Sequence, residues 1–279
     1  MHVHALRLGP FARRFLDTHR TATVSAVFAR SFHIEAGGDA MCVVEGSLGD
    51  GALNLVVETD PMSFSDVTAG ERCEFDEGGL SVGASLLLDV SHATPWLPPR
   101  TAFGPDVQES LQEVVDRALV RAPDDGAFRA TIDPDFMTAD NFVLALAERA
   151  RNFRLWLERD EPSPPPVAGL VGLGSGLTPS GDDLIGGAMI ALHAADRSTL
   201  AMRIGAAVES LGADATTVLS RSMLRAAAEG VGGSVLHEML DAIAAADAPR
   251  AIGLLDAIDG IGHTSGWDAL AGAMVALRS

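Results

Sequence analysis

The chain has 279 residues, 47% of them hydrophobic, so it can bury a substantial core and is not disordered. Its formal net charge of −18 argues against nucleic acid and anionic membrane surfaces as partners. All 20 basic residues are arginine, and the lack of lysine excludes a P-loop lysine and a Schiff-base lysine.

The sequence has few features that bear on cellular location or on redox chemistry. No stretch reaches the roughly 18 uninterrupted apolar residues of a membrane span, and no basic-then-apolar leader is present. We therefore expect a cytoplasmic protein. The two cysteines, Cys42 and Cys73, are too few for a disulfide framework or a structural zinc site, and we expect free, unreactive thiols.

The first third of the chain is rich in short apolar runs. We predict strands at residues 21–29, 40–45, 52–57 and 80–90, with a Gly-Ser-Leu-Gly-Asp-Gly turn cluster between the second and third. Short strands with glycine turns and no helices between them are typical of an antiparallel barrel or sandwich.

From residue 106 the apolar spacing becomes helical. We predict helices at 107–120, 138–157, 183–195, 199–211, 216–229, 233–246, 250–258 and 267–278. The predicted fold class is therefore α+β, with a β-rich N-terminal barrel or sandwich over residues 1–105 and an α-helical domain over 106–279.

The strongest sequence feature is a polar, glycine-rich loop that occurs twice, each time before an apolar helix. The first copy runs from Gly172 to Asp183 and the second from Gly262 to Asp268. When Ser180 is aligned with Ser265, an offset of 85, 8 of the 13 positions from Ser180 to Leu192 are identical. We predict that the two loops lie close together around a shared polar pocket.

Two interpretations of these loops stay open. Ser180-x-x-Asp183 and Ser265-x-x-Asp268 have the spacing of a capping box, which would explain the serine and the acid without any ligand. A cap does not need alternate glycines, and the N–H groups of such a loop before a helix are suited to binding an anion. The candidate ligand-binding residues are Gly174, Ser175, Gly176, Thr178, Ser180, Gly181, Thr217, Ser220, Thr264, Ser265 and Asp268.

Three further side chains are candidates for the chemistry itself. Asp182 and Asp183 are suited to accepting an amide N–H or to binding Mg²⁺, so a magnesium site is one option and no other cofactor is implied. His263 lies beside Thr264 and Ser265, where an imidazole can act as acid, base or anion donor. A helix between the two copies opens with Thr216, Thr217, Ser220 and Arg221, which could supply hydroxyls and a cation to the site or be a simple threonine cap with polar surface residues.

The string from Gly172 to Asp183, with Thr216, Thr217 and Ser220 and the closing Gly262–Asp268 segment, resembles the AllH family. That family is a subunit of bacterial oxamate carbamoyltransferase in purine (allantoin) catabolism. The resemblance covers about the last 115 residues. It implies phosphorolysis of oxalurate to oxamate and carbamoyl phosphate, or the reverse, in an oligomer with companion carbamoyltransferase subunits.

The resemblance also suggests roles for the candidate residues. The ligand would be phosphate, carbamoyl phosphate or an oxamate-like acid, held by the loop N–H groups, Thr178 and Ser180. Asp182 and Asp183 would position an amide or Mg²⁺, and His263 would polarise a carbonyl. The Ser-x-Arg-Thr phosphate motif of transcarbamylases is absent, so the alternative is a non-catalytic structural or regulatory subunit whose loops only cap helices.

Overall fold

A computed structural model describes residues 2–58, 64–76, 78–84, 86–104, 107–159 and 162–279. The chain divides into two compact units, Met1–Leu97 with Arg221–Ala226, and Pro98–Ser220 with Ala227–Ser279. It is 49% helical and 18% strand, which confirms the predicted α+β class. The domain boundary expected between residues 105 and 106 falls on two residues outside the described part of the chain.

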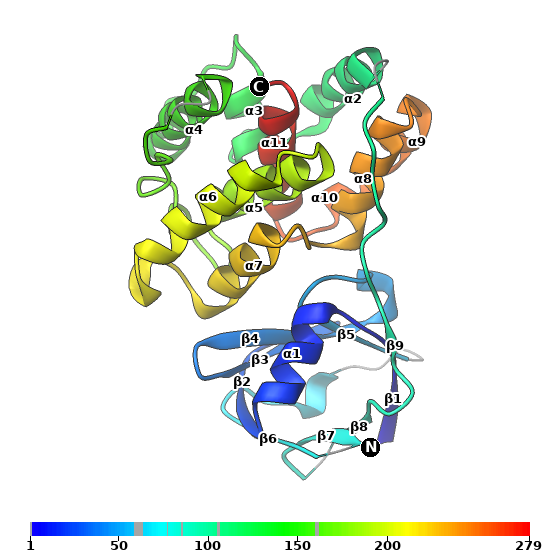
Figure 1. The fold of residues 1–279 in the computed structure, drawn as a ribbon. Helices are drawn as coiled ribbons and strands as arrows, with labels where there is room; N and C mark the ends of the chain where they lie inside the picture. The colour runs from blue at the N-terminus through cyan, green and yellow to red at the C-terminus, as the bar shows by residue number, and fades with distance from the viewer. Residues whose placement is uncertain (1, 59–63, 77, 85, 105–106, 160–161) are drawn as a thin grey trace. The chain divides into compact units, whose positions relative to one another are not determined.

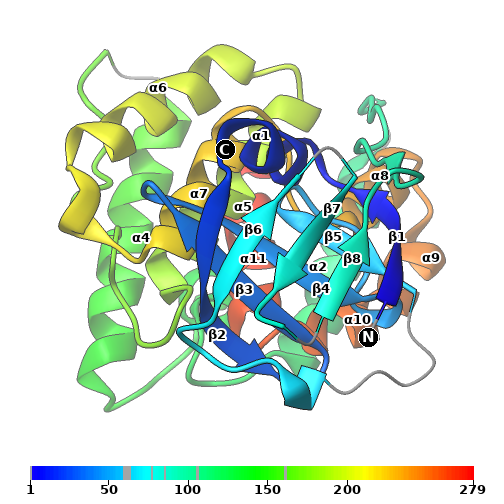
Figure 2. The same ribbon diagram turned by 90° about the horizontal axis from the view of Figure 1, so that it is seen from below.

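The first unit is a closed β-barrel (Figures 1 and 2). Its strands are β1 (His2–Leu8), β2 (Thr21–Phe28), β3 (Ser31–Ala36), β4 (Asp39–Glu45), β5 (Asn54–Val57), β6 (Arg72–Phe75), β7 (Gly79–Val82) and β8 (Leu86–Asp89). Their order is β5-β4-β3-β2-β6-β7-β8-β1, and pairing of β1 with β5 closes the ring. Strand β9 (Thr94–Pro95) pairs beside β1. Of the two predicted architectures, the barrel is the one formed.

The barrel is not fully antiparallel, which corrects the sequence-based expectation. Strands β4 and β5 are parallel, as are β1 and β8. The crossover from β4 to β5 is short and holds only the 3-10 helix η1 (Gly46–Leu48). Parallel neighbours usually need a connection of about a dozen residues or more, so this short link reads in the sequence as a hairpin turn.

The barrel interior is filled by alternate side chains, including Phe32, Ile34, Met41, Val43 and Leu55. This alternation explains why short Val-rich runs form strands here. Both cysteines are free and buried, and burial raises the pKa of the Cys42 and Cys73 thiols to about 12. Their thiolate forms are therefore scarce at neutral pH, as the expectation of unreactive thiols requires.

Helix α1 (Pro10–Thr18), which the sequence patterns missed together with β1, β3 and β6, packs on β4 and β5. Its proline at the first turn needs no hydrogen-bond partner there. The preceding Gly9 donates its N–H to the carbonyl of Asn54, and a Cβ at Gly9 would lie 2.0 Å from the carbonyl oxygen of Gly51. Only glycine allows this close approach. A second 3-10 helix, η2 (Phe64–Asp66), also belongs to this unit.

The second unit is helical (Figure 1). Its helices are α2 (Val107–Arg121), α3 (Ala127–Ile132), α4 (Asn141–Arg159), α5 (Ser180–Ala194), α6 (Ser198–Ser210), η3 (Ala213–Ala215), α7 (Val218–Ala228), α8 (Ser234–Ala244), α9 (Ala248–Gly253), α10 (Leu255–Asp259) and α11 (Ser265–Leu277). The middle of α7 is counted with the first unit. Helix α3 was not predicted, and the helix predicted at 250–258 is two short helices that meet at Leu254, next to Gly253.

Helices α5 and α11 form the centre of this unit. Each contacts the other extensively, α5 also packs against α3, α6 and α8, and α11 packs against α3, α4, α8 and α10. Both helices are apolar on nearly every face, which is the pattern of helices buried on all sides. Within the described part of the chain, no helix is both long and apolar enough to cross a membrane.

Candidate functional site

The two predicted loop–helix units meet as a pseudo-twofold pair. A Cβ at Gly187 of α5 would lie 1.9 Å from the carbonyl oxygen of Ala269 of α11. Reciprocally, a Cβ at Gly272 would lie 1.8 Å from the carbonyl oxygen of Leu184. Gly272 and Ala269 are the residues that the 85-residue offset assigns to Gly187 and Leu184, so each contact is repeated by its symmetry mate. Such reciprocity is the property of an isologous interface, here inside one chain.

This packing brings the N-termini of α5 and α11 together, as the sequence predicts for the loops. The hydroxyl oxygens of Thr178 and Ser265 are 2.9 Å apart. The Ser265 hydroxyl interacts with the carboxyl of Asp183, and the Ser180 hydroxyl interacts with the carboxyl of Asp268. Each serine therefore serves the acid of the opposite helix.

The pairs Ser180–Asp268 and Ser265–Asp183, which cross between the two helices, show whether each serine caps its own helix. Ser180 and Ser265 are the first helical residues, whereas the N-cap positions are Pro179 and Thr264, neither of which makes a side-chain capping bond. The capping-box interpretation of Ser-x-x-Asp is therefore wrong for both copies. A capping box would keep the serine and acid on one helix terminus, and here they join two termini.

Asp183 has the most unusual environment of the cluster. Its Oδ2 atom is buried and has no hydrogen-bond partner among the described residues. Burial raises the pKa of this carboxyl well above its usual range, and the charges of Asp268 and Asp182 raise it further. The hydroxyls of Ser265 and Thr178 act in the opposite direction, because they stabilise the ionised form.

Asp268 is fully buried but well supplied with donors. Its Oδ1 accepts from the N–H of Ala127, at the start of α3, and its Oδ2 accepts from the Thr264 hydroxyl at 2.8 Å. Burial raises the pKa of Asp268, while these donors and Ser180 partly offset the rise. The two acids thus differ, since Asp268 anchors α3 to α11 and Asp183 keeps an unsatisfied oxygen.

The first glycine loop combines internal contacts with open backbone. Gly172, Gly174 and Gly176 all have positive φ angles, of 73°, 133° and 89°. A Cβ at Gly172 would lie 2.3 Å from the Ala215 carbonyl oxygen, and one at Gly174 would lie 2.6 Å from the Ser180 nitrogen, so these glycines serve the fold of the chain itself. Gly176 faces open space.

The tip of that loop carries the free donors. Within the described part of the chain, the backbone N–H groups of Gly174, Ser175 and Gly176 donate to no other residue. Ser175 and Gly176 are exposed. Successive free N–H groups beside positive-φ glycines are the elements of an anion-binding nest.

Asp182 holds the loop in place. Its Oδ1 accepts from the N–H of Gly172 at 2.8 Å, and its Oδ2 accepts from the hydroxyls of Thr216 and Ser220. Thr217 caps α7 by accepting from the N–H of Ser220, and its hydroxyl donates to the carbonyl of Leu177. Thr217 and Ser220, predicted as ligand-binding, and Asp182, predicted to take part in the chemistry, thus tie the loop to the start of α7. Gly181 is likewise packed, because a Cβ there would lie 2.0 Å from the carbonyl oxygen of Leu170.

His263 lies at the exposed end of the second loop. Its Nε2 is 2.8 Å from Oδ2 of Asp125, and this hydrogen bond and charge raise the pKa of the imidazole. Among the described residues, no group of three or more His, Cys, Asp and Glu side chains is arranged to hold a metal ion. Asp182 is poorly suited to act as a magnesium ligand, because its carboxylate already accepts three hydrogen bonds from the protein.

The structure therefore brings together Thr178, Ser180, Asp183, Ser265 and Asp268 at the pseudo-twofold axis, with Thr264 beside them. Sequence reasoning missed Asp125 and Ala127, which contact His263 and Asp268. The Asp124-Asp125-Gly126 turn just before α3 was the available signal, but nothing in its spacing links it to a loop 140 residues later.

No solved structure matches this chain. The model of the family AllH, described as oxamate carbamoyltransferase subunit AllH, matches residues 170–277, which include both loops and their helices, and confirms the resemblance over this part of the chain.

Proposed function

We propose that this protein is a subunit of an oxamate carbamoyltransferase-like enzyme and binds a small anionic substrate at the paired loops. The reaction would be oxalurate and phosphate to oxamate and carbamoyl phosphate, or its reverse. The family match over residues 170–277 supports the enzyme class. The observation that carries the site is the buried, unpartnered Oδ2 of Asp183 beside a loop with free N–H groups.

The free N–H groups of Gly174, Ser175 and Gly176 supply the anion-binding part of the site. They can donate to a phosphate or carboxylate oxygen without any lysine. The hydroxyls of Thr178 and Ser265, which lie 2.9 Å apart, flank Asp183 and can exchange their mutual hydrogen bond for one to the ligand. In a chain of net charge −18, these uncharged N–H and O–H donors provide a local site that attracts an anion.

Asp183 fits a role toward the amide. In phosphorolysis, a phosphate oxygen bonds to the carbamoyl carbon, the C–N bond of oxalurate breaks, and the departing nitrogen takes a proton to form the oxamate amide. Burial favours the protonated form of Asp183, and a protonated carboxyl can give that proton or donate a hydrogen bond. In the reverse direction the same carboxylate accepts it. Asp182 acts as a positioning residue through the loop, and no step is derived through Mg²⁺.

The chain is expected to need companion subunits. Transfer of a carbamoyl group to or from phosphate requires neutralisation of charge as well as positioning. The Ser-x-Arg-Thr motif is absent, and the described contacts place no arginine against the loop N–H groups or Asp183. We therefore expect the purified chain alone to be nearly inactive and to gain activity with its partners.

The test is an assay of carbamoyl phosphate and oxamate turnover by colorimetric detection of the carbamoylated product, with and without companion subunits. Asp183→Asn should fold and assemble but lower the assembled enzyme's kcat at least tenfold, because the amide cannot transfer the proton. Exposed Glu238→Gln on α8 is the matched control and should leave kcat unchanged. Full activity of the Asp183→Asn assembly would reject the proposed site, and robust turnover by the isolated chain would reject the subunit role.

A further inference from the structure

Helix α7 is shared by the two units. Its ends, Val218–Ser220 and Ala227–Ala228, are counted with the second unit, and residues 221–226 are counted with the first. The helix has 11 residues, and isolated helices shorter than about 12–15 residues are marginal in water because they form too few hydrogen bonds to offset the cost of nucleation. Contacts from outside α7 therefore decide how firmly it is formed and where its first turn lies.

The first turn of α7 holds the first glycine loop. The hydroxyl of Ser220 donates to Oδ2 of Asp182 at 2.7 Å, and Oδ1 of Asp182 accepts from the N–H of Gly172 at 2.8 Å. Thr217, which directly precedes the helix, donates its hydroxyl to the carbonyl of Leu177. If this turn unwound or shifted, the loop would lose both attachments, so the geometry of the loop depends on α7.

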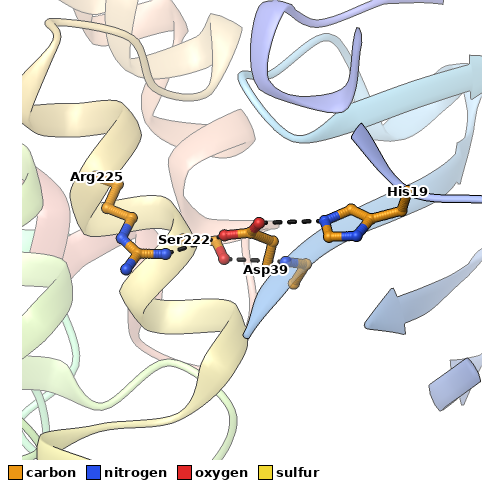
Figure 3. A network of polar contacts seen from close by, with 5 residues as sticks. His19, Asp39, Ser222 and Arg225 are labelled. Carbon is orange, nitrogen blue, oxygen red and sulfur yellow. Dashed lines mark hydrogen bonds and ion pairs between the residues drawn. The ribbon is translucent and has the colours of Figure 1, made fainter. Parts of the chain in front are cut away.

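The middle of α7 is held by the start of β4 (Figure 3). The buried Ala40 donates its N–H to the hydroxyl of Ser222 at 3.0 Å, and Arg225 Nη1 donates to Asp39 Oδ1 at 2.9 Å. His19, which ends α1, lies with its Nε2 3.2 Å from Asp39 Oδ2. Because a buried backbone N–H without a partner is costly, Ser222 cannot leave Ala40 without a loss of stability.

The position of Asp39 is itself fixed by the hairpin between β3 and β4. Gly37 and Gly38 both have positive φ angles, of 60° and 86°, as a two-residue hairpin loop of type I′ requires. Asp39 follows them as the first residue of β4. A Cβ at Gly37 would lie 3.0 Å from Cε1 of His19, so the turn packs against the imidazole that contacts Asp39. The carboxylate is therefore a fixed point of the barrel from which α7 is held.

We propose that Asp39 is a positioning residue for the first glycine loop, and that the barrel supports this loop through α7. The route runs from Asp39 and Ala40 to the middle of α7, and from Ser220 to Asp182 and the loop. Ser220 and Arg225 are five positions apart, which is about 7.5 Å along a helix axis, so a change at one is passed to the other within two turns. The inference rests on the proposed function, which makes this loop the anion-binding element.

Hydrogen exchange of the Gly172 amide, followed by NMR in the full chain, tests this route without an assay of activity. Asp39→Asn should speed the exchange at least tenfold, because a loosened α7 releases Asp182 more often. Asp50→Asn breaks the Arg7–Asp50 pair of the same unit and is the matched control, which should leave the exchange unchanged. An unchanged rate in Asp39→Asn, or an equal increase in both variants, would overturn the proposal.

A double-mutant cycle tests whether α7 carries the effect. Ser220→Ala removes a hydroxyl that holds Asp182 and should itself speed exchange of the Gly172 amide. Asp39→Asn added to Ser220→Ala should then bring no further tenfold increase, since both changes act on one route. Increases that multiply would show that the two residues act separately and would reject α7 as the route. Ser222→Ala should act like Asp39→Asn, and it decides the test if Asp39→Asn does not fold.

Kinetics of the assembled enzyme separate positioning from a loss of folded protein. A displaced loop weakens binding of the anion, so Asp39→Asn should raise the KM for carbamoyl phosphate at least fivefold and leave kcat within twofold. A loss of folded enzyme would instead lower kcat and leave KM unchanged, and that result would overturn the positioning role. If the wild-type assembly shows no turnover, the proposed function fails, and hydrogen exchange still decides whether α7 supports the loop.

Discussion

At the scale of single residues, Asp183 has a buried, unpartnered carboxyl oxygen that lowers the stability of the fold and is available to a ligand. A buried carboxyl oxygen without a partner destabilises the folded state, since the group loses its hydration and gains no hydrogen bond. Such groups are uncommon in folded proteins and cluster at functional sites. The contrast with Asp268, whose oxygens accept from Ala127 and Thr264, shows that the fold can satisfy an acid at this axis.

The raised pKa of Asp183 predicts a specific dependence of stability on pH. The folded state holds its proton to higher pH than the unfolded chain, so stability is full below the unfolded pKa of about 3.9 and falls as pH rises toward the folded value. Asp183→Asn removes this loss. We expect the variant to be more stable than the wild type at pH 8 by about 1–3 kcal/mol, and the difference to shrink toward pH 4.

Thermal melts of both proteins between pH 4 and pH 8 measure this difference. Glu238→Gln removes an exposed acid instead and should show a difference close to zero throughout. A stability difference for Asp183→Asn that does not change with pH would mean that Asp183 titrates normally.

At the scale of elements, the contact between α5 and α11 depends on glycine. Gly187 and Gly272 let each helix backbone touch a carbonyl of the other. Close approach of two backbones at small residues maximises dispersion contacts and excludes water. This contact also fixes the distance between the two helix N-termini and hence the geometry of the crossed serine–acid pairs.

Gly187→Ala should therefore destabilise the protein by about 1–3 kcal/mol or more, because the new methyl group would collide with the Ala269 carbonyl and not with a flexible side chain. Gly253→Ala is a matched control at the end of α9, where a Cβ meets nothing within 4 Å. It should be neutral or slightly stabilising, by up to about 1 kcal/mol, because alanine favours helix. Chemical denaturation measures both, and equal effects would show that the helices can move apart at no cost.

The same elements show what the sequence could predict. Most helices of the second unit were predicted from helical spacing of apolar residues, although α3 was not, and the meeting of the two loops was predicted from the 85-residue repeat. Strands β1, β3 and β6 were missed because they are short or mix polar with apolar residues. The single strand predicted at 80–90 was also wrong, because the chain forms the antiparallel pair β7 and β8 there. The crossing of Ser180 to Asp268 could not be read from spacing, because a local capping box and a cross-helix pair use the same residues.

At the scale of the whole molecule, charge is the dominant property. The chain has 38 acidic and 20 basic residues, so repulsion among like charges outweighs attraction on average. Exposed ion pairs such as Arg250–Asp241 contribute only about 0–1 kcal/mol each and do not reverse this balance.

Added salt should consequently stabilise the protein. The Debye length falls from roughly 30 Å at 0.01 M to about 8 Å at 0.15 M, which screens repulsion between distant acids. We expect the melting temperature at pH 8 to rise by several degrees over this range, equally in NaCl and KCl. A melting temperature that falls would show that attractive pairs dominate, and a rise confined to one salt would point to a bound ion instead of screening.

Of the five positions from 180 to 192 at which the halves of the repeat differ, one pairs a charged side chain with an aromatic one. Residues 182 and 267 are equivalent by the offset of 85, yet Asp182 anchors the first loop, whereas Trp267 packs on Phe128 and donates to Asp259. Two identical halves would offer a bound molecule two interchangeable orientations. In a homodimer every substitution appears in both halves, but an internal duplication lets each half change alone. The difference between Asp182 and Trp267 therefore makes the two loop–helix units unequal. A bound molecule whose two ends differ would meet a different environment at each end.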